Sequence, residues 1–99
     1  MLVNKSLTMD FEKHKISLKG RPVALTLHEF KILLALMSSP GRVFSRDELL
    51  GHLYPEGEAT VIDRVVNEHV GKIRQKIEKD PSKPRYILTI RGLGYKFND

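Results

Sequence analysis

Residues 60–97 read TVIDRVVNEHVGKIRQKIEKDPSKPRYILTIRGLGYKF, and this stretch decides the fold. Its first half, Val61–Lys79, has the periodicity of an amphipathic helix about 28 Å long, at about 1.5 Å per residue. The segment Asp80–Pro84 ends the helix, because its two prolines cannot continue it. The rest, Arg85–Phe97, predicts a β-hairpin, since the turn Arg91–Gly94 contains two glycines that accept the positive φ values of tight turns.

The two faces of this predicted helix differ in chemistry. At about 100° per residue its apolar side chains share one arc, which we expect to face the core, with Ile62 and His69 at its edge. The core residues are Val66, Val70, Ile73 and Ile77. The opposite arc carries Arg64, Glu68, Gly71, Lys72, Gln75 and Lys79, with Asn67 and Arg74 on one flank.

The polar arc suits the major groove of DNA. Amide, guanidinium and ammonium groups reach base edges there, and Gly71 would let the helix backbone approach. The alternative is a solvated face on which Arg64, Glu68 and Lys72 form ion pairs at i,i+4 spacing. The hairpin favours DNA, because Arg91 at its turn can enter a narrow minor groove next to the helix.

Other hairpin residues divide between contact and packing. Thr89, Lys96 and Arg85 are placed to touch phosphates, which add affinity but little sequence information. The remaining large side chains are interpreted as core: Tyr86, Ile90, Tyr95 and Phe97.

Upstream segments predict strands followed by a first helix. Short alternating pieces between Leu7 and Leu25 indicate a small antiparallel meander. Thr26–Glu29 fits a capping box that starts a helix, and Ser38–Gly41 ends it. The apolar stripe expected on this helix is Leu27, Phe30, Leu33, Leu34 and Met37.

A second capping box, Ser45–Glu48, starts a short helix that Pro55 stops. Its inward residues are expected to be Leu49, Leu50 and Leu53. Thr60–Asp63 is a third box-like start, after a loop over Tyr54–Ala59. The order is strands, helix, short helix, long helix and hairpin. We therefore expect an α+β fold of the winged-helix type, with residues 1–99 as a single domain.

Composition narrows the class of protein. The 99 residues hold 17 Lys and Arg against 12 Asp and Glu, a net charge of +5 that favours an anionic partner such as nucleic acid. Residues 41–60 are the one net-acidic block. The lack of cysteine excludes disulfides and thiolate metal sites and fits a cytoplasmic location. No stretch approaches the roughly 20 apolar residues of a membrane span, so we expect no membrane partner.

No motif indicates catalysis. The sequence contains no P-loop, no Gly-x-Gly-x-x-Gly and no nucleophile elbow. His14, His28, His52 and His69 lie on different predicted elements without metal-ligand spacing, and His69 is interpreted as a core histidine. We expect no enzyme activity, no cofactor and no metal.

Four motifs in order resemble the DNA-binding effector domain of the OmpR/PhoB family of bacterial response regulators. Tyr86–Phe97, YILTIRGLGYKF, is similar to the family pattern Y-I-x-T-[VI]-R-G-x-G-Y-x-F. Asp63–Ile77 resembles R-T-V-D-V-H-I-x-x-L-R-x-K-L, and Leu25–Phe30 and Val43–Leu50 resemble the starts of the family's first two helices. The resemblance covers essentially the whole chain.

The resemblance implies a four-stranded N-terminal sheet, three helices and a C-terminal wing. It implies sequence-specific binding of duplex DNA and transcription regulation, by dimers on direct repeats in promoters. Carried over by position, Arg46 would hold a phosphate beside backbone amides, and Tyr54, where many members have Trp, would pack on the sugar-phosphate. Asn67 and Glu68 would face base edges. The further contacts would be Lys72, Arg74, Thr89 on a phosphate and Arg91 in the minor groove, and Arg64, Gly71 and Gln75 complete the predicted interface.

The loop Tyr54–Ala59 is longer than the usual three- or four-residue turn. The resemblance implies that Glu56 and Glu58 in this loop contact RNA polymerase. An ordinary solvated loop is the alternative.

Three features depart from the family pattern. Val65 stands in place of the usual Thr. Asn67 and Glu68 replace the commoner Asp-Val, and because Asn favours adenine and Glu can accept from cytosine N4, the target sequence should differ. The receiver domain, through which a sensor histidine kinase would act, is absent. We expect an excised effector domain, with a stand-alone regulator as the alternative.

Two other binding classes compete with this interpretation. An RNA-binding domain would usually show stacking aromatics on a sheet, whereas the aromatics here are interpreted as core. A winged helix that binds only protein would lack the basic third helix and wing.

Overall fold

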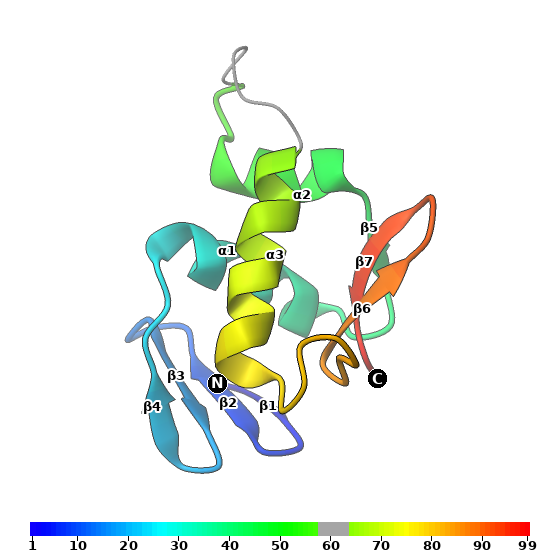
Figure 1. Cartoon of the computed structure of the whole chain (residues 1–99). Helices are drawn as coiled ribbons and strands as arrows, with labels where there is room; N and C mark the ends of the chain where they lie inside the picture. Colours follow the sequence, from blue (N-terminus) through cyan, green and yellow to red (C-terminus); the bar gives the residue numbers. More distant parts are fainter. Residues whose placement is uncertain (58–63) are drawn as a thin grey trace.

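The computed structural model describes residues 1–57 and 64–99 and confirms the expected α+β winged-helix architecture (Figure 1). An antiparallel N-terminal sheet has the strand order β1-β2-β3-β4. Its strands are β1 (Leu2–Asn4), β2 (Leu7–Asp10), β3 (Lys15–Leu18) and β4 (Arg21–Val23). Leu7, Met9 and Ile16 are buried, because alternate side chains of a strand share the face that packs on the helices.

α1 (Leu27–Ser38) begins at the predicted capping box. Thr26 Oγ1 accepts from the Glu29 amide at 3.2 Å, and Glu29 Oε1 accepts from the Thr26 amide at 3.0 Å. The predicted stripe is wrong at Leu27, which is 56% exposed, whereas Ile32 and Leu36 are fully buried. The reason is that α1 contacts α2, α3 and strands of both sheets, so it buries more than one stripe.

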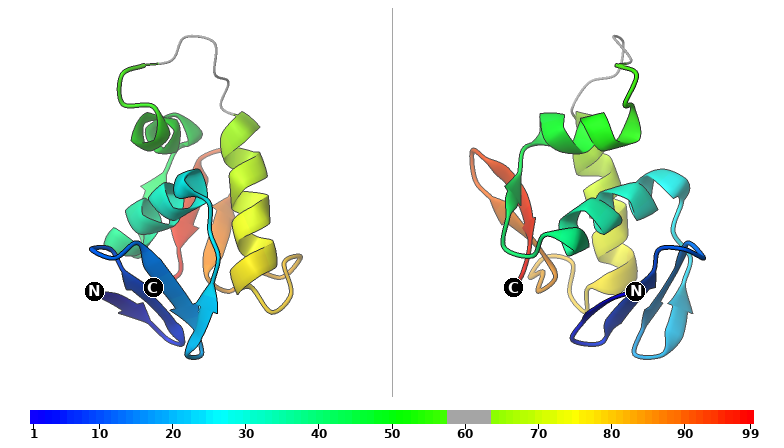
Figure 2. Two further views of the ribbon diagram at one scale, coloured as in Figure 1. Left: turned by 90° about the vertical axis from the view of Figure 1, so that its left-hand side faces the viewer. Right: turned by 180° about the vertical axis from the view of Figure 1, so that it is seen from behind.

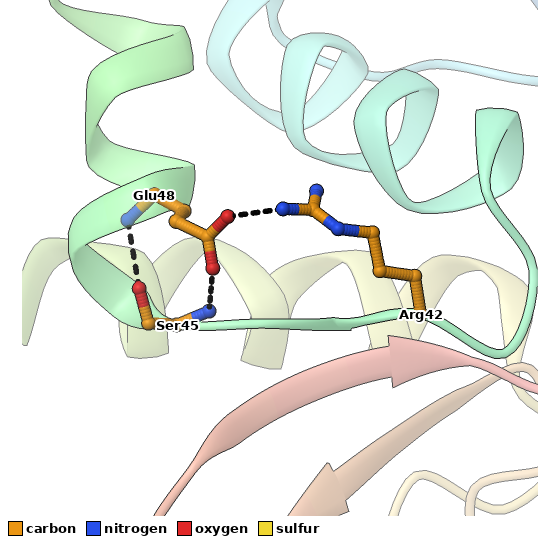
Figure 3. A network of polar contacts seen from close by, with 3 residues as sticks. All are labelled: Arg42, Ser45 and Glu48. Carbon is orange, nitrogen blue, oxygen red and sulfur yellow. Dashed lines mark hydrogen bonds and ion pairs between the residues drawn. The ribbon is translucent and has the colours of Figure 1, made fainter.

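α2 (Arg46–Leu53) also begins at its capping box, and the polar network there includes an arginine (Figure 3). Ser45 Oγ accepts from the Glu48 amide and Glu48 Oε1 accepts from the Ser45 amide, both at 3.0 Å. Arg42 forms an ion pair with the other carboxylate oxygen of Glu48. Leu49 and Leu53 are buried as predicted, and Leu50 is half-buried.

α3 (Arg64–Ile77) ends at Ile77 rather than at the expected Lys79. The cause is Glu78, whose carboxylate accepts hydrogen bonds of 2.7–3.1 Å from the backbone amides of Arg85, Tyr86 and Ile87 and so turns the chain. The capping box predicted at Thr60–Asp63 lies outside the described residues.

A second sheet joins the hairpin to the chain before α2. It has the order β5-β7-β6, with β5 (Val43–Phe44), β6 (Ile87–Ile90) and β7 (Gly94–Phe97). The sequence did not indicate β5. Gly94, at φ +146°, permits this pairing, since a Cβ there would overlap the carbonyl oxygen of Phe44.

The layers place the hairpin beside α3 and leave α2 and the N-terminal sheet at opposite ends of the molecule (Figures 1 and 2). Tyr95 and Phe97 are buried in the core as predicted, Tyr86 packs partly buried against it, and Ile90 is half-buried. No helix in the described part of the chain is long and apolar enough to cross a bilayer.

Candidate nucleic-acid interface

The two arcs predicted on α3 are both observed. Val66, Val70 and Ile73 have no exposed surface and Ile77 has 1%. Ile62 lies outside the described residues. The opposite arc is exposed along its whole length: Arg64, Glu68, Gly71, Lys72, Gln75 and, just past the helix end, Lys79. Burial of the apolar arc therefore fixes which side chains of α3 an external partner meets.

Gly71 has no packing role inside the domain. A Cβ at this position would meet nothing within 4 Å. An exposed helix interior is a costly place for glycine, by roughly 0.5–1 kcal/mol relative to alanine. Gly71 therefore leaves bare helix backbone on the outer face of α3.

The alternative of a salt-bridged face is only partly realised. Arg64 Nε lies 3.9 Å from Glu68 Oε1, and both side chains are more than half exposed, so the pair contributes little. Lys72 makes no ion pair with any residue that the structure describes. Its ammonium group is left for an external partner.

Four predicted contact residues line one hollow of about 330 Å³. They are Arg46 at the start of α2, Asn67 on α3, Thr89 on β6 and Arg91 at the hairpin turn. Three separate elements thus bring Arg46, Asn67 and the two hairpin residues to one side of the molecule. Leu93, which is 64% exposed, lies at the same turn.

Asn67 is bonded to the wing. Its Oδ1 accepts a 2.6 Å hydrogen bond from the hydroxyl of Tyr95, which is only 8% exposed. Among the residues that the structure describes, no partner of the Asn67 amide nitrogen is found. Sequence reasoning treated Tyr95 as core packing only; the missed signal is that a buried tyrosine hydroxyl needs a polar partner.

Arg74 and Thr89 are also joined to each other. The Arg74 guanidinium donates to the carbonyl oxygen of Ile87, at 2.9 Å from Nη2, and to Thr89 Oγ1 at 2.7 Å. It lies 5.5 Å from the ring centre of Tyr95, and burial lowers its pKa. Arg74 therefore links α3 to β6 by hydrogen bonds. The exposed Thr89 hydroxyl accepts from Arg74 and can still donate its own proton to an external acceptor.

The start of α2 gathers polar groups beside the hollow. Arg46 is exposed there. Arg42, which sequence reasoning did not single out, stacks on the Phe44 ring with 4.1 Å from its guanidinium carbon to the ring centre, and it is paired with Glu48 (Figure 3). Because Arg42 compensates the Glu48 carboxylate, the capping box adds little negative charge at this edge.

The other predicted residues lie apart from the hollow. Tyr54 is half-buried at the end of α2, with its ring 5.2 Å from that of His28. His69, interpreted as a core histidine, is half-buried 5.3 Å from His28, and burial, followed by the proximity of His28, lowers its pKa. Glu56 is exposed beyond α2, and Glu58 lies outside the described residues.

Comparison with known proteins shows the family. Residues 20–97 match the family described as "Transcriptional regulatory protein, C terminal". The chain is 41% identical to the DNA-binding response regulator MtrA of Mycobacterium tuberculosis (strain ATCC 25618 / H37Rv), over 97% of this chain and 42% of MtrA. It is 43% identical to the sensory transduction protein RegX3 of Mycolicibacterium smegmatis, over 89% of this chain and 38% of RegX3. The chain thus spans less than half the length of these relatives.

Solved structures of response regulators and of their DNA-binding domains have the same fold as this chain. The response regulator DrrB, a Thermotoga maritima OmpR/PhoB homolog, superposes with a TM-score of 0.89 at 39% identity, over 99% of this chain and 44% of DrrB. The DNA-binding domain of Klebsiella pneumoniae RstA, in complex with the RstA box, gives 0.84 at 31% identity, over 98% of this chain and 96% of that domain. The AdeR DNA-binding domain, in complex with an intercistronic region, gives 0.83 at 29% identity, over 98% of both chains. The chain therefore belongs to the family of C-terminal domains of transcriptional regulatory proteins, the winged-helix DNA-binding effector domains of OmpR/PhoB-type response regulators.

Proposed function

We propose that this domain binds duplex DNA sequence-specifically, with α3 in the major groove and the hairpin turn in the minor groove, and so regulates transcription. The observation that carries the proposal is the hollow shared by Arg46, Asn67, Thr89 and Arg91, next to the exposed arc of α3. Base-reading and phosphate-binding groups face one side, which is the arrangement that a winged helix needs to straddle a phosphate backbone. The AdeR and RstA domains, similar over nearly their whole length, were solved in complex with DNA.

The contacts divide by chemistry. Lys72 and Gln75 project from the exposed arc and are proposed to read base edges, with Gly71 allowing a close approach. Arg64 and Glu68 extend that face toward the helix start. We propose that the DNA sugar-phosphate backbone is contacted by Arg46, Thr89 and Tyr54, which would set the position of the domain on the duplex. Arg91 is proposed to enter the minor groove. Arg74 supports this surface from inside through its bonds to β6.

Asn67 takes a narrower role than its residue type suggests. A bidentate contact to adenine needs both its oxygen and its nitrogen. The Tyr95 hydroxyl occupies one lone pair of the oxygen and holds the amide in place, which leaves the nitrogen as the main group that can turn toward DNA. We propose that Asn67 donates to a single acceptor in the major groove, such as guanine O6, thymine O4 or a purine N7.

The wider protein is proposed to be a cytoplasmic two-component response regulator. The names and lengths of MtrA and RegX3 support a further domain, a receiver that a sensor histidine kinase would control. The domain would bind promoter direct repeats as a dimer. The loop after α2, with Glu56 and Glu58, is proposed to face RNA polymerase, because its acidic residues would be repelled by DNA.

Selection of bound sequences from a pool of random duplex DNA tests the proposal. We expect an enriched motif, repeated at about one helical turn (about 10–11 base pairs) if two copies bind. Affinity for the selected duplex should fall with salt on a log–log slope of several units. Arg91→Ala should weaken DNA binding by about 1–3 kcal/mol and leave the free energy of unfolding unchanged. Lys13→Ala, on the distant β2–β3 turn, should not weaken DNA binding.

The rival classes give different results. No measurable duplex binding at low salt would contradict the proposal and favour a winged helix that binds only protein. Preferential binding of single-stranded RNA would favour the RNA-binding alternative.

A further inference from the structure

We propose that a second basic surface, at the end of α3 away from α2, holds the phosphate backbone of the DNA that flanks the recognised site. The inference rests on the proposed function. This surface, the basal groove, surrounds a hollow of about 970 Å³. Its basic residues are Lys5, Lys19, Arg21, Lys79, Lys83 and Arg85.

The fold brings these cations together from distant parts of the chain. Lys5 lies in the β1–β2 turn and Lys19 in the β3–β4 turn, and both turns are at the sheet end next to the last turn of α3 (Figures 1 and 2). The Lys19 amide donates to the Ser6 carbonyl at 2.8 Å, which fixes the two turns side by side. Lys79, Lys83 and Arg85 follow α3 on the other wall.

Turn geometry does not explain the two lysines. Lys5 and Lys19 have φ values of +52° and +53°, in the left-handed region where glycine and asparagine are the ordinary choices. Both side chains are exposed. Neither lysine packs inside the fold, so both ammonium groups are available to an external anion.

The groove has an uncompensated positive charge. In the part of the chain that the structure describes, none of its six cations forms an ion pair. Its two carboxylates are engaged elsewhere: Glu78 by three backbone amides, and Asp80 by the hydroxyl of Ser82 at 2.6 Å. Even if both carboxylates and about half a negative charge from the helix C-terminus are subtracted, a surplus of roughly 3.5 positive charges remains.

The groove is continuous with the face of α3 proposed to enter the major groove. Lys79 ends the exposed arc that contains Lys72 and Gln75, and it also lines the groove. The 14 residues of α3 span about 21 Å, whereas the major groove of DNA is about 12 Å wide. If α3 crosses the major groove, its Lys79 end extends over a phosphate backbone, and the basal groove lies at that end.

Two duplexes test this inference with the binding site obtained by selection. The short duplex stops at the edges of the site, and the long duplex adds about 12 base pairs of mixed sequence on each side, roughly one helical turn. The variant is Lys5→Asn with Lys19→Asn, because asparagine accepts the left-handed conformation and keeps the turns. The matched control is Lys13→Gln with Lys15→Gln, which removes two charges from the opposite end of the same sheet.

We expect the wild-type domain to bind the long duplex several-fold more tightly than the short one at low salt. Its log–log salt slope should be steeper by about two units on the long duplex, at about 0.9 per phosphate contact. The Lys5/Lys19 variant should lose this difference and bind the short duplex normally, while the control keeps the difference.

Equal slopes for the two duplexes in the wild-type domain would overturn the inference and leave sequence-specific binding intact. An equal loss of affinity in the variant and its control would also overturn it, because that loss would be a general effect of net charge. If the variant retains the full difference between the duplexes, the basal groove does not bind flanking DNA, and an acidic protein surface becomes the better candidate for its partner. Failure of both duplexes to bind the wild-type domain would contradict the proposed function itself.

Discussion

Tyr95 on β7 donates a 2.6 Å hydrogen bond to Asn67 Oδ1 on α3, so the wing and the outward-facing helix are bonded to each other through side chains. Arg74 adds a second link, since its guanidinium donates to Ile87 and Thr89 of β6. These contacts fix the position of the hairpin relative to α3. The two parts of the proposed interface are thus preorganised in the free domain, which lowers the entropic cost of binding.

Tyr95→Phe should change base preference more than fold. Removing the hydroxyl leaves the ring packed and frees Asn67 Oδ1, so Asn67 can then make a bidentate contact to adenine. We expect selected sequences to shift toward adenine at one position and the free energy of unfolding to fall by about 1 kcal/mol. Selection from random DNA and urea denaturation measure the two effects.

Tyr86→Phe is the matched control, because no hydrogen bond of the Tyr86 hydroxyl is found among the described residues. It should leave both the selected sequence and the stability unchanged. An unaltered motif in Tyr95→Phe would mean that Asn67 Oδ1 does not contact a base even when it is free.

Arg74 and Lys72 should separate stability from binding. Arg74→Lys loses the planar fork that holds β6 and should lower the free energy of unfolding by about 1–3 kcal/mol. Lys72→Ala removes an exposed side chain and should leave stability within about 0.5 kcal/mol while weakening DNA binding or relaxing base preference. Chemical denaturation and binding titrations of both variants check this, and the reverse pattern would exchange the two roles.

Gly71→Ala should move stability and binding in opposite directions. Alanine favours the helix over glycine, and the new methyl group meets open space, so the domain should gain about 0.5–1 kcal/mol in unfolding free energy. The same methyl group should weaken DNA binding by blocking the approach of the backbone. Gly51→Ala on α2 has equal room and should stabilise without affecting binding. DNA binding as tight as wild type in Gly71→Ala would remove Gly71 from the interface.

Glu29 should make stability depend on pH. Burial tends to raise the pKa of this carboxyl, but hydrogen bonds from Lys76 Nζ, at 2.6 Å, and from the Thr26 amide outweigh burial, so the pKa lies below its ordinary 4.5. A carboxyl whose pKa is lower in the folded state stabilises above its unfolded pKa and loses that stability as pH falls through the folded value. Glu29→Gln should therefore cost about 1–3 kcal/mol at neutral pH.

The cost of Glu29→Gln should shrink below about pH 4.5, because Glu29 becomes protonated first in the unfolded chain and, at lower pH, in the folded domain. Paired denaturation curves of wild type and variant across pH 3–7 measure this difference. A gap that stays constant with pH would mean that the ion pair with Lys76 contributes nothing.

Local signals in the sequence predicted much of the fold. The capping boxes at Thr26 and Ser45 are formed by residues three apart, so their hydrogen bonds depend on little beyond the local chain. The outer face of α3 follows from the spacing of four apolar residues, since α3 buries only this one side against the rest of the domain. The exposed positions of Lys72 and Gln75 were therefore predictable.

The missed features depend on contacts between distant residues. Tyr95 and Asn67 are 28 positions apart, and Arg74 and Ile87 are 13 apart, so no local pattern reveals that they meet. β5 has only two residues and exists because β7 lies beside it. Leu27 has a helical spacing like its buried neighbours, but it lies in the first turn, where no other element covers it.

Glu78 has a consequence for how the domain tolerates change. Its carboxylate accepts from the amides of Arg85, Tyr86 and Ile87, so the two ends of the loop over residues 79–84 are held together. Length changes inside that loop would move Lys83 of the basal groove but leave α3 and the hairpin in place, because both ends of the loop stay anchored. Substitution of Glu78 would instead free these three amides and loosen the link between the end of α3 and the start of β6.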